Sequence, residues 1–110
     1  MDTRTKIISL SEAAIRLEQE GLLAVQIDCD PLLASQVAAL LELGRPLLAL
    51  ISEKENSYLS LQARAELAAS LAVIRYVTIG ELKDALDLRT QESVWRLELE
   101  NLVRARNEAK

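Results

Sequence analysis

Two aspartates flank the single cysteine of the chain, at Asp28, Cys29 and Asp30, where a predicted strand leads into a predicted helix. In an α/β fold such a junction can bind phosphate, because the helix N-terminus presents free N–H groups and the positive end of its dipole. Carboxylates at that point could also share a Mg²⁺ ion with a phosphate. Residues 22–43, however, contain no glycine, lysine or arginine, and the whole chain contains no histidine. The junction therefore has the position of a nucleotide site and lacks the residues that would carry its chemistry.

A plainer role is favoured for each of these side chains. Asp30 precedes Pro31, which suits the first turn of a helix, so its carboxylate is predicted to cap that helix rather than to hold a metal. Cys29 could be a reactive thiolate at a helix N-terminus. Because no histidine can serve as its base, a small buried thiol is the favoured interpretation. We predict no catalytic residue and no metal site.

The elements that position these residues alternate along the chain. Apolar runs rich in β-formers predict strands at 22–27, 46–51 and 73–79. A capping box, Ser9-x-x-Glu12, opens a helix that ends at Gly21. Further helices are predicted over 31–43, 59–71 and 81–88. This order predicts a three-layer α/β/α, Rossmann-like fold with a small parallel sheet, whose ligands would bind beyond the carboxyl ends of the strands.

Composition narrows the classes of partner. The net charge is −4 with no basic stripe, and the chain has no Phe, one Trp and two Tyr, so nucleic-acid binding is not expected. No apolar run is long enough for a membrane span, and the start of the sequence does not resemble a signal peptide. One cysteine fits a reducing compartment, so we expect a cytoplasmic chain.

The C-terminal segment differs in character from the rest. Residues 1–88 are predicted to form the α/β domain, and residues 89–110 an added charged helix. Trp95, Leu99 and Leu102 share one face of that helix, and we expect them to be buried. They could dock on their own domain or form the seam of a homodimer. The dimer is favoured, because a small sheet without a further strand leaves an edge that needs cover.

Three stretches resemble the cytidylyltransferase-like nucleotidyltransferases, most closely the adenylyltransferase domain of ADP-heptose synthase. Residues 6–13, followed by a strand and by residues 29–37, resemble the beginning of that domain. Residues 59–71 resemble its Pro-x-x-x-Arg-Ala-Glu-Leu helix, and residues 73–77 resemble its Cys-Val-Asp-Tyr-Val strand. The similarity covers roughly residues 6–82 and implies a nucleotide site at the first strand end.

The departures from that family decide what the resemblance implies about activity. The match places Asp30 on the family's aspartate, Leu33 and Gln36 on its two motif histidines, and Ser35 on its glycine. In the family these histidines hold phosphates and stabilise the charge of departing pyrophosphate. Loss of such contacts removes several kcal/mol of transition-state stabilisation. The family's longer basic loop is also replaced here by residues 52–58, whose Glu53, Lys54 and Glu55 are predicted to be an ordinary solvated loop.

The resemblance and its departures together predict a degenerate nucleotidyltransferase-like domain without transferase activity. It would bind a nucleotide or sugar phosphate, or another protein, and use no cofactor. Two alternatives stay open: an active enzyme that forms an NDP-sugar or NDP-polyol with Mg²⁺, and a purely structural homo-oligomer. Arg64 could reach a phosphate or pair with Glu66 or a loop carboxylate. The predicted vestigial nucleotide site comprises Asp30, Ser35, Gln36, Ser52 and Arg64.

Overall fold

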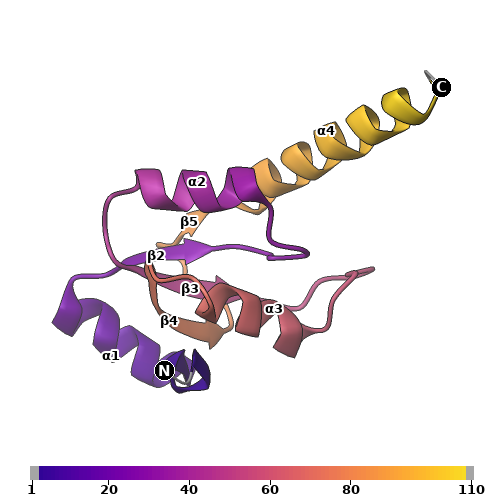
Figure 1. Cartoon of the computed structure of the whole chain (residues 1–110). Helices are drawn as coiled ribbons and strands as arrows, with labels where there is room; N and C mark the ends of the chain where they lie inside the picture. The colour runs from indigo at the N-terminus through magenta and orange to yellow at the C-terminus, as the bar shows by residue number, and fades with distance from the viewer. Residues whose placement is uncertain (1–2, 109–110) are drawn as a thin grey trace.

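The computed structural model describes residues 3–108 and shows an α/β fold built on a parallel sheet (Figure 1). Several side chains of the C-terminal helix, Trp95 and Leu99 among them, lie outside the described residues. In chain order the described elements are a 3₁₀ turn η1 (Thr3–Lys6), β1 (Ile7–Ile8), α1 (Leu10–Glu20), β2 (Leu23–Gln26), α2 (Ala34–Glu42), β3 (Leu47–Ile51), α3 (Leu61–Ala69), β4 (Ile74–Ile79), β5 (Leu86–Asp87) and α4 (Arg89–Glu108).

The strands of the sheet lie in the order β1-β4-β3-β2-β5, and every neighbouring pair is parallel. The three strands predicted from apolar runs are confirmed as β2, β3 and β4 at its centre. The edge strands β1 and β5 were not predicted, because two residues carry no periodic signal. Since β5 pairs with β2, the edge that we expected to need cover is already occupied, and this argument for a dimer falls away.

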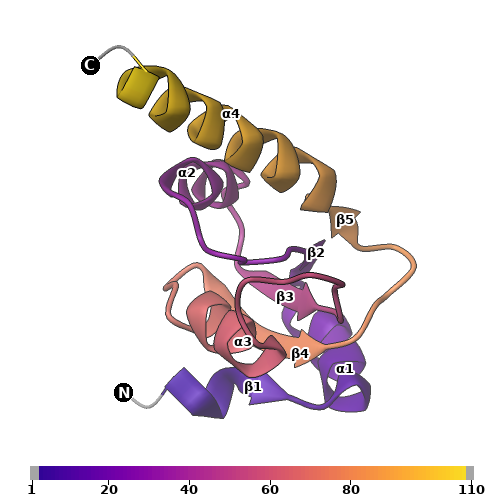
Figure 2. The same cartoon turned by 90° about the vertical axis from the view of Figure 1, so that its right-hand side faces the viewer.

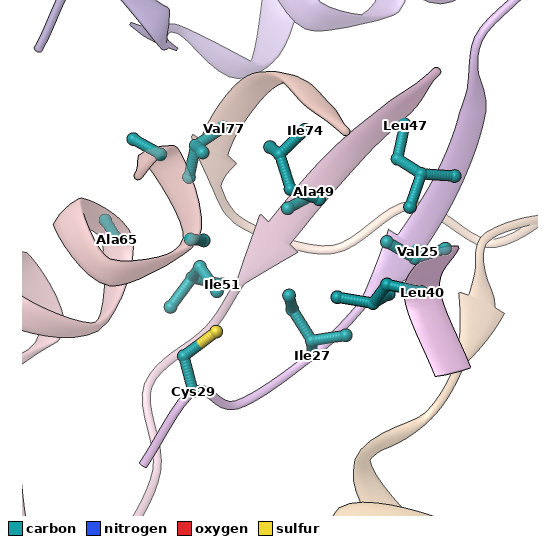
Figure 3. Close-up of a cluster of buried hydrophobic side chains, with 12 residues drawn as sticks. Val25, Ile27, Cys29, Leu40, Leu47, Ala49, Ile51, Ala65, Ile74 and Val77 are labelled. Carbon is teal, nitrogen blue, oxygen red and sulfur yellow. The ribbon is translucent and has the colours of Figure 1, made fainter. Parts of the chain in front are cut away.

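Two clusters of buried aliphatic side chains fix the sheet between its helices. The larger one includes Val25, Ile27 and Ala49, with Leu40 from α2 and Ala65 from α3 (Figure 3). The other cluster gathers around Ala13 of α1 and contains side chains of the alternate strand positions, Ala24, Leu48 and Leu50. Alternation along the strands thus sends neighbouring residues to different helices, as expected for strands covered on both faces.

The ends of α1 follow the predicted capping chemistry. The Ser9 side chain accepts a hydrogen bond from the Glu12 amide at 3.2 Å, and Gly21 ends the helix with a left-handed φ of 62°. In α2 the prediction was wrong at the start: the helix begins at Ala34 rather than Pro31. The Asp30–Pro31 peptide is cis, and Leu33 is an extended N-cap residue without a side-chain cap bond. Asp30 therefore does not cap α2.

The predicted helix over 81–88 is also wrong. This segment is a turn followed by β5, in which Leu86 and Asp87 lie beside Val25 and Gln26. The Leu88 amide then donates to the Gln26 carbonyl at 3.0 Å and continues the pairing to the start of α4. Contacts with β2 outweigh the weak local preference of a short helix.

The helix α4 begins directly after β5 and extends away from the sheet (Figures 1 and 2). Its first turn lies at the end of β5, and its later turns project beyond the body of the domain. Among the residues that the structure describes, no helix is both long and apolar enough to cross a membrane.

Candidate functional site

A cluster of buried charged side chains lies at the carboxyl ends of β2 and β3. Parallel neighbours end at the same edge of a sheet, so the loop after β2 brings Asp28 and Asp30 beside Ser52 and Lys54, which follow β3. Arg64 reaches the same point from the second turn of α3. This edge is where ligands bind in open α/β sheets.

Arg64 joins the two strand ends. Its side chain is 1% exposed, and its three nitrogens all donate: Nε to the Asp28 carbonyl at 2.7 Å, Nη1 to the Ser52 carbonyl at 2.9 Å and Nη2 to Asp28 Oδ1 at 3.3 Å. Of the two roles left open for this arginine, the geometry shows a loop carboxylate as its partner. That carboxylate is Asp28; Glu66 instead accepts a hydrogen bond from Gln62.

Asp30 fastens the loop before α3. Its carboxylate accepts N–H bonds from Leu59 at 2.8 Å and Tyr58 at 3.0 Å, and Lys54 Nζ lies 3.3 Å from Oδ2. Burial raises the pKa of the Asp30 carboxyl, but the two amides and Lys54 outweigh burial and hold it below its ordinary value of 3.8. Asp30 is thus a structural anion.

The prediction of an ordinary solvated loop is wrong at Lys54, which pairs with the aspartates of the cluster. Its ammonium also lies 3.7 Å from Asp28 Oδ2, and its side chain is 24% exposed.

Glu92, in the first turn of α4, completes the cluster from a distant part of the chain. Both of its carboxylate oxygens lie within 3.1 Å of the Asp28 amide nitrogen, and Oε2 also accepts from the Cys29 amide at 3.2 Å. Two successive N–H groups thus converge on one acceptor, and Cys29 itself has a left-handed φ of 52°. Consecutive amides in such a turn form a concave anion site, known as a nest. Here a carboxylate fills it.

Cys29 is buried, as predicted, with its sulfur in the apolar cluster (Figure 3). Burial, together with the negative charge of Glu92, raises the pKa of the thiol to about 12. Gln36 is 1% exposed, and its amide nitrogen lies 4.0 Å from this sulfur. A thiol in this setting is inert at neutral pH.

A hollow of about 390 Å³ lies beside the charged cluster, at the carboxyl ends of β2 and β5. Arg89 connects the two: it lines the hollow, and its Nη1 donates to the Ser52 hydroxyl at 3.3 Å and to Glu81 at 2.9 Å. Its other nitrogens hold Asp87, with Nη2 at 2.7 Å. Gln26 and Lys83 also line this space. The hollow has the volume and mixed polarity of a small-ligand pocket.

The structure brings together most of the predicted vestigial site. Asp30, Ser52 and Arg64 belong to one network, and Gln36 joins it through Cys29. Ser35 differs, because it is exposed on the first turn of α2.

Three further residues of the site were missed by sequence reasoning. Lys54 carried a signal, as the one cation in the loop after β3. Glu92 and Arg89 carried none, since their partners Asp28 and Ser52 lie 64 and 37 residues away.

The predicted interface residues have separate outcomes. Leu102 is 59% exposed, so in this chain it does not dock on its own domain. The side chains of Trp95 and Leu99 lie outside the described residues. Their burial and the homodimer stay predictions.

The acidic side chains of the cluster do not fit Mg²⁺. Both oxygens of Asp30 and both of Glu92 already accept N–H bonds, and Asp28 pairs with Arg64 and Lys54. Within residues 3–108 the side chains described include no group of three or more His, Cys, Asp or Glu arranged to hold a metal ion.

Comparison of the chain with protein-family models, with curated proteins and with solved structures found no match in any of the three.

Proposed function

We propose that this chain is a nucleotidyltransferase-like, three-layer Rossmann-type domain that binds a nucleotide or another phosphate compound and does not transfer a nucleotidyl group. The observation that carries the binding part is the hollow of about 390 Å³ at the carboxyl ends of β2 and β5. Arg89 and Lys83 line it together with Glu81 and Asp87, which pair with Arg89, and the neighbouring loop after β2 has two converging backbone amides that now hold Glu92. A phosphate group would take the place of these carboxylates. This combination suits a phosphate group attached to a larger body.

The positions that match the family's motif support a loss of transfer chemistry. Leu33 is the N-cap residue of α2, and its side chain makes no hydrogen bond there. Gln36 is buried against Cys29, and Ser35 is exposed. Neither motif histidine therefore has a charged replacement at its own position. Arg64 and Lys54, the cations of the charged cluster, are engaged with Asp28 and Asp30.

Calorimetric titration with ATP and CTP tests the proposed binding, and a pyrophosphate-release assay with sugar phosphates and Mg²⁺ tests the proposed lack of transfer. We expect binding without pyrophosphate release. Arg89→Ala should weaken nucleotide binding by about 10- to 100-fold, because one charge-assisted hydrogen bond to phosphate contributes about 1.5–3 kcal/mol. The matched control is Arg104→Ala, which removes an exposed arginine from the projecting part of the same helix. Pyrophosphate release by the unmodified chain would favour the alternative of an active enzyme.

A homodimer formed through α4 is a second candidate for what the domain does. It is supported by the exposed apolar side chains that α4 carries, at 49–59% exposure: Val94, Leu97, Leu102 and Val103. A projecting helix with such a surface suits a protein partner better than water. Light scattering of the intact chain and of a chain ending at Leu88 would test this candidate. Loss of a dimer on truncation is the expected result, and a monomeric intact chain at high concentration contradicts it.

A further inference from the structure

The nest at the end of β2 already holds an anion, and that anion belongs to the protein. We propose that Glu92 is an internal competitor for the site, so that an external phosphate group binds the Asp28 and Cys29 amides only when the first turn of α4 releases them. This inference concerns the regulation of the proposed nucleotide or phosphate site and rests on that proposed function.

The nest is suited to an oxyanion irrespective of which one occupies it. Its two amides are consecutive, and both donate to the same carboxylate. Arg64 stabilises the turn from behind by donating to the Asp28 carbonyl at 2.7 Å. Exchange of the Glu92 carboxylate for a phosphate would retain a negative charge at this point. The site then needs no rearrangement of Lys54 or Arg64 to stay balanced.

Among the side chains that the structure describes, those that attach α4 to the domain lie near its start. Near its start, hydrogen bonds join it to the domain through the Leu88 amide, Arg89 and Glu92. The apolar side chains described farther along the helix are largely exposed and add little to its attachment. Segments with few buried apolar contacts open locally at low free energy. The carboxylate is therefore a tethered ligand, and it lowers apparent affinity for an external anion by the fraction of time that the nest is open.

The ligand chemistry is a compact oxyanion, and two sources could supply it: free inorganic phosphate or the phosphate group of a nucleotide. Inorganic phosphate tests the nest alone, whereas ATP and CTP also engage the hollow beside Arg89. The two arms of the titration separate these sources.

The test measures binding of inorganic phosphate to the full chain and to Glu92→Ala. We expect at least about tenfold tighter binding in the variant, because the competing carboxylate is gone. Glu18→Ala is the matched control, since it removes an exposed glutamate from α1 and should leave affinity unchanged. In the unmodified chain, phosphate should change the fluorescence of the chain's one tryptophan, Trp95, which follows Glu92 by three residues on α4.

Equal phosphate affinity in Glu92→Ala, Glu18→Ala and the unmodified chain would overturn the proposal. Should circular dichroism show that Glu92→Ala is unfolded, Glu92→Gln replaces it, because its amide oxygen can still accept from the nest. A smaller gain of the same sign then supports competition, and no gain overturns it. Nucleotides bound equally by the unmodified chain and by the variant would contradict competition and leave the proposed function standing. A gain for phosphate in Glu92→Ala, with no nucleotide binding by either protein, would support competition and contradict the nucleotide part of the proposed function.

Discussion

The two ends of α4 are parts of one helix in opposite surroundings. Glu92, in the first turn, is 2% exposed and bonded to the end of β2, whereas Leu102, ten residues later, is 59% exposed. A surface helix is ordinarily held by burial of an apolar stripe, with its charges in water. In α4 a carboxylate is buried at one end while apolar side chains meet solvent at the other. The comparison teaches that, among the described side chains of α4, those that join the helix to the domain do so through polar bonds at its base.

The charged cluster at the carboxyl ends of β2 and β3 is likewise held together by polar bonds. It is a polar network beside a largely aliphatic core. Each charged side chain in it has a partner: Arg64 and Lys54 pair with the two aspartates, and Glu92 accepts from backbone amides. Loss of one member leaves its partner buried and unpaired, which costs far more than loss of a surface charge. In the projecting part of α4, the described side chains of residues 101–106 are exposed. Substitutions in the two regions should therefore differ sharply in effect.

The largest expected effect is that of Arg64→Ala. It leaves the Asp28 carboxylate without its guanidinium and two loop carbonyls without a donor, so the free energy of unfolding should fall by about 3–5 kcal/mol. Arg64→Lys should recover only part of this, because one ammonium cannot reach all three acceptors of the fork. Urea unfolding followed by circular dichroism measures both. A loss below about 1 kcal/mol in Arg64→Ala would show that the network is not a main source of stability.

Cys29 should react very slowly with thiol reagents in the native chain. The rise of its pKa from 9.0 to about 12 lowers the thiolate population at neutral pH about a thousandfold, and burial adds to the protection. Labelling rates with a disulfide reagent, in native buffer and in urea, measure this difference. Rapid labelling of the native chain would mean that reagent reaches the end of β2, and it would contradict the burial of Cys29.

Asp30 should make stability sensitive to acid. Because its folded pKa lies below 3.8, its contribution is present above that pH and is lost as the pH falls through the folded value. Asp30→Asn should be about 1–3 kcal/mol less stable at neutral pH, since the amide keeps one acceptor oxygen and loses the charge facing Lys54. The gap between the two proteins should narrow as the pH falls below about 4. A gap that is constant with pH would exclude this role of the Asp30 charge.

The smallest expected effect is that of Leu102→Ser. An exposed side chain on a projecting turn contributes little to the stability of the fold. The free energy of unfolding of the monomer, measured by thermal unfolding, should therefore change by no more than about 0.5 kcal/mol. The same substitution should weaken a homodimer formed through α4, because it removes an exposed apolar side chain from that helix. Light scattering distinguishes the two effects. A large loss of stability with no change in mass would mean that α4 packs on its own domain after all.

The central strands could be predicted from the sequence because β2 and β3 lie in nearly continuous apolar runs and β4 is rich in residues that favour strands. The two-residue strands β1 and β5 could not, since pairing with β4 and β2 creates them. Local chemistry was also reliable for Ser9 and Gly21, whose capping roles depend on residues within one helix.

The candidate site shows the opposite case. Asp30 has the sequence position of an N-cap, yet its acceptors are used by amides 28 and 29 residues away. Glu92 looked like any acidic residue in a charged helix, and only the fold brings it to the Asp28 amide. Buried polar networks join residues that are distant in the chain, so local patterns could suggest members such as Arg64 but not their partners.

Nuclear magnetic resonance titration of the full chain with ATP and CTP tests the central claim most directly, because it locates the ligand as well as detecting it. The account predicts concentration-dependent shifts of the backbone amides of Asp28, Cys29 and Arg89, with little change at the Glu18 amide on α1. Shifts confined to other parts of the molecule, or none at millimolar nucleotide, would contradict a phosphate-binding site at the carboxyl ends of β2 and β5.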